Sequence, residues 1–487
     1  MDFPPGPRMP RLMQAAFVTA SPYGWMVRRW RRYGDVFSSR FPIFGRVVYL
    51  ADPALVKEVF TGNAKTFHAG EANTLALGDA LGEHSLLTLD EDRHLSQRKL
   101  LLPPFHGESV RRYVEVMTEA TEREVASWPV GTQIELRPRM QAITLDVILR
   151  AVFGVRDDER MDLFRERIPL LGETTSVLNW LPFMDRDLGG MTPAARFRRA
   201  LAAVDELIYA EIADRRAAAP EGDQRDDVLS LLLRARHEDG SAMTDGELRD
   251  ELMTLLTAGH ETTATGLAWA FERLLRTPRV LERLTGSLED DDYLDAVVKE
   301  ALRVRPVIVD VARKLTREVE IAGWRLPAGT LVLPAIAVLH ARPDLYESPA
   351  EFRPERFLGG ERRRAGTARS RVGAESYAWI PFGGGVRRCI GASFAQVEMR
   401  TVLREVLRRV RLRAPTQRPE RGVIRHVTVV PARGARAIVE AKTDARGHRP
   451  LAGRGLTLEP AAELAGAHNG RPGVADAPSE VPVRRHD

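Results

Sequence analysis

The residue of this chain best suited to metal or nucleophilic chemistry is its single cysteine, Cys389. One cysteine forms no intramolecular disulfide and builds no multi-cysteine zinc or iron–sulfur site, which excludes a secreted disulfide scaffold. Cys389 follows three glycines in the segment 381–391, and an apolar pattern with helical spacing comes directly after it. Free backbone N–H groups, a helix N-terminus and the neighbouring Arg387 and Arg388 all favour a thiolate. The alternative is an inert, buried thiol.

The glycine-rich turn before Cys389 could also be a flexible loop or a phosphate-binding loop. A phosphate-binding loop requires a following Gly-Lys-Ser/Thr, which this segment lacks. The phosphate reading is therefore excluded.

A second polar group, Ala258-Gly-His-Glu-Thr-Thr, lies midway along a predicted helix over 245–276. Its His-Glu pair matches half of a zinc-protease motif, but Ala264 stands where the second histidine is needed, so that function is excluded. Thr262 can hydrogen-bond to a carbonyl four residues earlier and Gly259 relieves crowding, so we expect the helix to open locally here. The alternative is a helix whose polar residues are merely buried by their neighbours.

A third motif is Glu300-Ala-Leu-Arg303. Residues three apart share a helix face, so the carboxylate and the guanidinium can pair. Without further context this pattern is typical of an ordinary surface ion pair.

The segment around the cysteine resembles the haem-binding loop of the cytochrome P450 family at every signature position: Phe382, Gly385, Arg387, Cys389 and Gly391. The resemblance implies that Cys389 is the axial thiolate ligand of the iron of haem b. A thiolate pushes electron density through iron and promotes O–O cleavage.

The motif on the long helix resembles the family's oxygen-activation motif. The resemblance implies that Thr262 holds the oxygen species and a water, and that Glu261 relays protons as a general acid. Ala258, at the start of the motif, belongs to the implied cofactor-binding set.

The resemblance also implies anchors for the haem propionates, for which guanidinium groups are well suited. They are His94 and Arg98 of an early His-x-x-x-Arg pattern, Arg313, and Arg387. Glu300 and Arg303, with Arg356, resemble the family's buried structural network on the cysteine side of the haem.

The elements that must position these residues are mostly helices. Helical periodicity is clear over 110–128, 195–216 and 245–276. Strand signals are confined to 47–50 and to two pairs of strands. One pair is predicted over 317–334 and the other over 427–438, with a turn at Arg433-Gly434. The sequence predicts a mainly α fold with a minor β portion, the cytochrome P450 fold, as a single large domain over residues 1–442. An Arg- and Gly-rich loop over 359–374 and a disordered tail over 443–487 complete the chain.

Composition limits the kinds of partner that this chain is expected to bind. The net charge of +5 arises from 72 basic and 67 acidic residues that alternate along the 487-residue chain, so nucleic-acid binding is not expected. No run of apolar residues is long enough for a membrane anchor. We expect a cytoplasmic protein, similar to soluble actinobacterial members of the family, with its motifs closest to the mycobacterial branch.

The expected function is a haem-thiolate monooxygenase that inserts one atom of O2 into a C–H or C=C bond of a lipophilic small molecule. No dinucleotide-binding fingerprint is present, so electrons from NAD(P)H are expected through a separate ferredoxin reductase and ferredoxin. Two alternatives are a peroxide-driven peroxygenase and an electron-transfer or sensor haem protein. The expected substrate walls are 67–87, 175–183, Leu255, Leu256 and 307–309, and the expected ferredoxin contacts are Arg111, Arg112, Arg388 and the loop 362–364.

Overall fold

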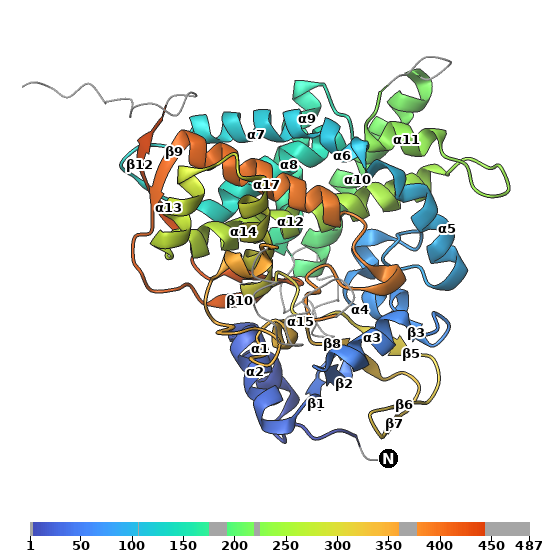
Figure 1. Cartoon of the computed structure of the whole chain (residues 1–487). Coiled ribbons are helices and arrows are strands. Elements are labelled where there is room, and N and C mark those ends of the chain that lie inside the picture. Colours follow the sequence, from blue (N-terminus) through green and yellow to red (C-terminus); the bar gives the residue numbers. More distant parts are fainter. Residues whose placement is uncertain (1–2, 106, 175–191, 219–224, 360–376, 444–487) are drawn as a thin grey trace, which may run out of the picture. The chain divides into compact units, whose positions relative to one another are not determined.

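The computed structural model describes residues 3–105, 107–174, 192–218, 225–359 and 377–443. It is 55% helical and 13% strand, which confirms the predicted mainly α class with a minor β portion (Figure 1). The expected substrate wall 175–183, the arginines 362–364 and all but the first residue of the predicted tail lie outside the described residues.

The helices fall along the whole described chain. They are α1 (Arg11–Ala20), α2 (Pro22–Tyr33), α3 (Pro53–Thr61), α4 (Gly70–Leu81), α5 (Glu91–Leu101), α6 (Glu108–Arg112), α7 (Val114–Ala126) and α8 (Leu136–Ala151), followed by α9 (Asp158–Thr174), α10 (Pro193–Ala218), α11 (Val228–Arg234), α12 (Asp245–Leu274), α13 (Pro278–Gly286), α14 (Asp291–Val304), α15 (Ile336–Leu339) and α17 (Ala392–Arg409). Short 3₁₀ turns are η1 (Pro103–Phe105), η3 (Pro354–Phe357) and η4 (Gly385–Arg387).

The strands are short and form four small sheets. They are β1 (Val36–Phe41), β2 (Gly45–Leu50), β3 (Phe67–His68), β4 (Gln133–Glu135), β5 (Arg313–Leu315), β6 (Val319–Ile321), β7 (Trp324–Leu326), β8 (Leu331–Pro334), β9 (Val410–Arg413), β10 (Gly422–Arg425), β11 (Thr428–Pro431) and β12 (Arg436–Lys442). The largest sheet has the order β1-β2-β8-β5-β3, in which β2 and β8 run parallel. It thereby joins the N-terminal part of the chain to the segment after α14.

Helix α12 is the central element of the helical part, where α7, α8, α12, α14 and α17 lie side by side (Figure 1). A capping box starts it: Thr244 Oγ1 accepts the Glu247 N–H (3.2 Å) and the Glu247 carboxylate accepts the Thr244 N–H (2.8 Å). Two glycines allow close packing. A Cβ at Gly259 would lie 3.0 Å from Ile148 of α8, and one at Gly266 would lie 3.3 Å from Met399 of α17.

Two local expectations are wrong in detail. The predicted helix over 110–128 is divided into α6 and α7 at Tyr113. The predicted opening of the long helix at Gly259 does not occur, since α12 is continuous from Asp245 to Leu274. The polar side chains there bond within the helix or across to α8 without displacing the backbone.

The predicted strand pair over 427–438 is also wrong. Both strands exist, but β11 pairs with β10 whereas β12 pairs with β4 and β9. The turn at Arg433-Gly434 carries the chain from one sheet to the other, because buried Glu420 accepts the N–H groups of Arg433 (2.8 Å) and Arg436 (3.0 Å). Pairing of short strands depends on distant partners that local alternation does not specify. By contrast, the strand pair predicted over 317–334 is confirmed by the hairpin β6–β7, which turns at Ala322-Gly323.

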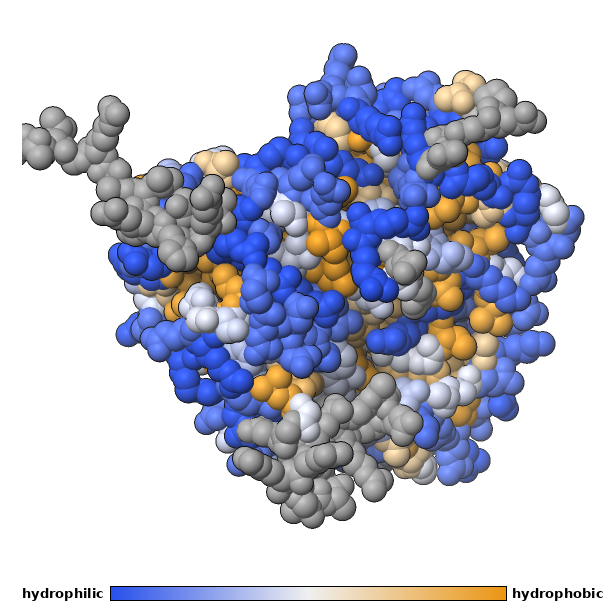
Figure 2. Space-filling view, turned by 45° about the horizontal axis from the view of Figure 1, so that its top comes forward, coloured by the Kyte–Doolittle hydropathy of each residue, from blue (hydrophilic) through white to orange (hydrophobic). Residues whose placement is uncertain are grey.

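No helix within the described parts of the chain is long and apolar enough to cross a membrane. The face seen in Figure 2 is mostly hydrophilic, with apolar residues in scattered patches.

Candidate functional site

The loop that carries Cys389 is a tight turn built by glycines. Gly383 and Gly385 have φ values of 68° and 64°, in the left-handed region that favours glycine. A Cβ at Gly385 would lie 1.9 Å from the Phe60 carbonyl oxygen, so no other residue fits there. The turn closes when the Cys389 N–H donates to the Phe382 carbonyl (2.9 Å). The signature glycine is thus explained by a backbone contact with α3.

Cys389 itself is accessible, although protein surrounds it on most sides. That burial raises the pKa of its thiol, and the Gly391 N–H, Arg98 and Arg388 oppose the rise. Helix α17 begins three residues later, with Gly391 at its N-cap. The groups expected to favour a thiolate are therefore present. Burial has the larger effect on the pKa of the thiol until a cation binds the sulfur.

The four residues expected to anchor propionates lie together. His94 is 2% exposed on α5, and its pKa falls to about 3 because of burial and because Arg387, Arg98 and Arg313 surround it. The same burial and mutual repulsion lower the pKa of Arg313 and that of Arg387 to about 10. Residues that are 293 positions apart in the sequence thus form one basic cluster around a neutral imidazole.

Arg387 already has a carboxylate partner, Asp90. Its guanidinium pairs with Asp90 and donates to the carbonyls of Leu86 (3.2 Å) and Leu89. Asp90 also accepts the N–H groups of Ala69 (2.9 Å), Gly70 and Glu71 at the start of α4. Asp90 therefore fixes Arg387 and α4 together.

The middle of α12 is accessible, whereas the stretches on either side of it are buried. Residues 248–256 and 263–272 are buried, but every residue from Thr257 to Thr262 is partly or fully exposed. Within this stretch Thr262 donates its hydroxyl hydrogen bond to the Ala258 carbonyl. An exposed stretch in the interior of a core helix indicates an internal recess.

Glu261 is held by two side chains of α8. It accepts a hydrogen bond from Arg137 (2.7 Å) and one from Gln141 (2.6 Å). The surrounding protein desolvates the ring of the neighbouring His260, which lowers its pKa to about 4 and keeps it neutral at physiological pH. The carboxylate expected to relay protons is therefore fixed in place by α8.

The Glu300 motif forms a buried network rather than a surface pair. Glu300 is fully buried and accepts hydrogen bonds from Arg303 (2.7 and 2.8 Å) and Arg356 (3.1 Å). Arg303 donates to the His340 carbonyl (2.7 Å), and the Nε2 atom of His340 accepts the Ile380 N–H (3.0 Å). The network thus extends from α14 to the segment that leads into the cysteine loop.

Comparison with known proteins now decides the family. The family model described as Cytochrome P450 matches residues 4–436. The chain belongs to the cytochrome P450 family. Cytochrome P450 135B1 of Mycobacterium tuberculosis is 46% identical over 454 residues, which cover 91% of this chain and 93% of that protein. Cytochrome P450 138 of the same organism is 39% identical and covers 90% and 96%, respectively.

Solved cytochrome P450 structures share the fold. The retinoic acid-bound cyanobacterial CYP120A1 has a TM-score of 0.76 at 26% identity and covers 90% of this chain and 99% of that one. The haem domain of cytochrome P450DA has a TM-score of 0.77 at 24% identity and covers 92% and 99%. The predicted cytochrome P450 fold is confirmed, and this chain is a haem-thiolate monooxygenase that uses O2 and a redox partner.

The residues present fit the haem of a cytochrome P450. Arg98 is half-buried and Arg313 is 7% exposed, yet no carboxylate of the described chain pairs with either. Since Asp90 neutralises Arg387, the cluster keeps an excess of two positive charges, which two propionates would match. The accessible sulfur of Cys389 and the accessible stretch of α12 complete a site that can take iron on one side and substrate on the other.

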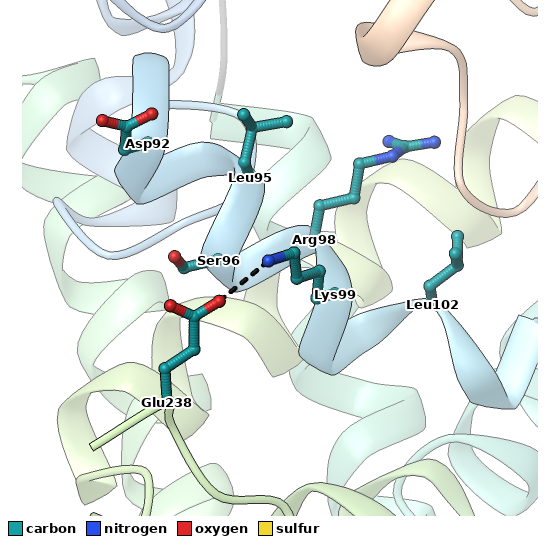
Figure 3. Close-up of a pocket in the computed structure, with 7 residues that line it drawn as sticks. All are labelled: Asp92, Leu95, Ser96, Arg98, Lys99, Leu102 and Glu238. Atoms are coloured by element: carbon teal, nitrogen blue, oxygen red, sulfur yellow. Dashed lines mark hydrogen bonds and ion pairs between the residues drawn. The ribbon is translucent and has the colours of Figure 1, made fainter.

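The outer side of α5 forms a groove next to the cysteine loop. It is lined by Asp92, Leu95, Ser96, Arg98, Lys99, Leu102 and Glu238 (Figure 3). Lys99 pairs with Glu238 across it (2.8 Å), whereas Arg98 points away and donates to the Arg388 carbonyl (2.8 Å). Helix α5 therefore presents His94 to the interior and a charged groove to the surface.

Sequence reasoning missed the partners that hold the site residues. Asp90 is one, and the signal for it was an acidic residue just before the helix that carries His94. Arg137 is another, and nothing in its local sequence indicates that it pairs with Glu261, which is 124 residues away.

Proposed function

We propose that this cytochrome P450 inserts one oxygen atom into a C–H or C=C bond of a lipophilic small molecule. The observation that carries the proposal is the accessible stretch 257–262 of α12, which directly follows the buried apolar residues Leu255 and Leu256. Leu255 of α12 is 8% exposed, and Val307 and Val309 of the segment after α14 are 7% and 8% exposed. Apolar walls with few polar groups favour an apolar ligand. The similar CYP120A1 was solved with retinoic acid, itself a lipophilic molecule.

The haem, when bound, supplies the iron that activates O2. Cys389 would hold the iron, while Arg98, Arg313, Arg387 and the neutral His94 would hold the propionates. The buried basic cluster favours this binding, because the unpaired guanidinium groups gain charge-assisted hydrogen bonds.

Two residues of α12 would handle protons. The Thr262 hydroxyl donates to the Ala258 carbonyl, and its oxygen is accessible to a water. Glu261 would supply protons through water from its carboxyl oxygens, which Arg137 and Gln141 keep in one position. Ala258 leaves open space beside the hydroxyl, because its side chain is a single methyl group.

We further propose that electrons pass from NAD(P)H through a ferredoxin reductase to a ferredoxin that docks beside the cysteine loop. Arg111 and Arg388 are exposed, and neither forms an ion pair with a described residue. Arg112 is exposed but pairs with Asp226 (2.7 Å), so it is less available to a partner. Free positive charges near Cys389 suit an acidic electron carrier.

A substrate screen on the haem-loaded enzyme tests the lipophilic class. Long-chain alcohols, terpenes and sterols should convert the haem spectrum from low spin to high spin, and hydrophilic sugars of similar size should not. Turnover with a ferredoxin system should then yield oxygenated products. A spin-state shift with sugars alone, or no product from any compound that shifts the spectrum, would refute the proposal.

A further inference from the structure

The segment between α14 and β5 crosses the site in an irregular, extended conformation. Val307 packs into the same apolar core as α12, and Arg313 belongs to the basic cluster around His94. Asp310 lies three residues from each. Because three residues span at most about 11 Å, its backbone is within that distance of both the substrate wall and the cluster.

Hydrogen bonds hold this segment on the N-terminal side of Asp310. The Val307 carbonyl accepts the Val429 N–H (2.8 Å), and the Val309 carbonyl accepts the Ala337 N–H (3.0 Å). The Tyr23 hydroxyl donates to the Pro306 carbonyl (2.9 Å). The Asp310 side chain therefore starts from a fixed backbone, which reduces the entropy lost when it binds a ligand.

The Asp310 carboxyl group has no partner among the residues that the structure describes. No described residue donates a hydrogen bond to it or pairs with it, and its flanking residues are Val309 and Val311. It is partly accessible, yet dense surrounding protein raises its pKa to about 7. Its neighbours Val309 and Val311 pack in hydrophobic clusters of the core, so this accessible carboxyl lies at an internal recess rather than on the outer surface. A buried carboxylate without a partner is costly, so a ligand that pairs with it gains affinity.

Tyr49 of β2 is a second polar group near Asp310. The charge of Asp310 contributes to the raised pKa of the Tyr49 phenol, so the two groups lie within electrostatic range. The Tyr49 ring stacks on Phe37 (5.0 Å between centroids) and meets Trp25 edge-on, which fixes its position. Among the described residues none hydrogen-bonds to its hydroxyl. Tyr49 and Val309, the residue before Asp310, belong to the same hydrophobic cluster, so two polar groups without a hydrogen-bond partner among the described residues lie in one apolar neighbourhood.

We propose that Asp310 determines substrate specificity: its carboxyl group binds a hydrogen-bond donor, a hydroxyl or a protonated amine, at one end of an otherwise lipophilic substrate. Tyr49 provides a second, weaker contact to the same polar end. This inference rests on the proposed lipophilic substrate class and narrows it to amphiphiles with a donating end. Fatty acids are disfavoured, because a substrate carboxylate would be repelled by Asp310.

Three probes with the same apolar chain test the proposal on the haem-loaded enzyme: dodecan-1-ol, N,N-dimethyldodecylamine and dodecanoic acid. Affinity is measured by the spin-state shift and, independently of the haem spectrum, by calorimetry. The alcohol or the amine should bind at least about tenfold more tightly than the acid, as expected for a hydrogen bond to a charged group. Asp310→Ala should abolish this preference.

Asp310→Asn separates the two donor classes. If the bound group is an ammonium, the Asn variant loses the preference for the amine; if it is a hydroxyl, the Asn carbonyl still accepts and the preference for the alcohol persists. Tyr49→Phe should weaken binding less than Asp310→Ala. The matched control is Glu318→Gln, an exposed carboxylate between β5 and β6, which should change no affinity.

Equal affinity of the wild-type enzyme for all three probes would overturn the proposal, as would a preference that survives in Asp310→Ala with normal haem content. Failure of all three probes to bind the wild-type enzyme, while sugars bind, would instead refute the lipophilic class itself.

Discussion

At the scale of single residues, arginines carry the positive charge of the site, and its histidines are neutral. The histidines His94, His260 and His340 are all held neutral, with pKa values of about 3, 4 and 3, because burial and nearby arginines oppose their protonation. Positive charge resides instead on arginines, which stay protonated at any physiological pH. These three histidines therefore contribute no charge that changes between pH values of about 5 and 8.

Thr262 provides a prediction at this scale. Thr262→Ala removes the hydroxyl that would hold a water at this position. Proton delivery in the site should therefore become less efficient, whereas haem binding should not change. We expect less product per NAD(P)H consumed and more hydrogen peroxide, with an unaltered carbon monoxide difference spectrum. Thr257→Ala is the matched control, since Thr257 bonds back to the Met253 carbonyl (2.8 Å) one turn earlier on the same helix. Full product yield per electron in Thr262→Ala would contradict the assigned role.

At the scale of elements, features that the local sequence encodes could be predicted. Features that depend on residues distant in the sequence could not. The cysteine turn was predictable because glycine spacing and the following helical period are local features. The course of α12 was predictable from its periodicity, but its continuity past Gly259 depends on packing against Ile148 of α8. The partner of Arg387 was not predictable, because Asp90 reaches it only once α5 has docked on the cysteine loop.

The buried Glu300 network is the element-scale feature that should respond most strongly to mutation. Glu300→Gln would leave Arg303 buried without its counter-charge, and breaking a buried pair in this way costs about 3–5 kcal/mol. We expect a loss of that size in the free energy of unfolding, measured by denaturant titration, together with weaker haem retention, because Arg303 connects through His340 to Ile380. Glu318→Gln, at an exposed position, should leave both unchanged. Unfolding of Glu300→Gln at the wild-type denaturant concentration would show that the network contributes no net stability.

At the scale of the described fold, the C-terminal strands support the distal side of the site. The carbonyls of Gly434 and Ala435 accept the N–H groups of Arg137 (3.0 Å) and Leu136 (3.4 Å) at the start of α8. Arg137 in turn pairs with Glu261. The position of the Glu261 carboxylate thus depends on a turn more than 170 residues away in sequence.

The surface beside the cysteine loop gives the prediction that concerns the whole molecule and its redox partner. If an acidic ferredoxin docks there, its association is steered by Arg111 and Arg388, so electron transfer should slow as ionic strength rises. Arg388→Glu and Arg111→Glu should each lower the second-order rate of reduction several-fold at low salt and flatten its salt dependence.

Arg325→Glu, on the exposed part of the β6–β7 hairpin, makes the same charge change at a different sheet and should have little effect. Stopped-flow reduction under carbon monoxide measures these rates directly. Equal slowing by Arg325→Glu would mean that net charge governs the association, and no slowing by either arginine variant would place the ferredoxin on another face.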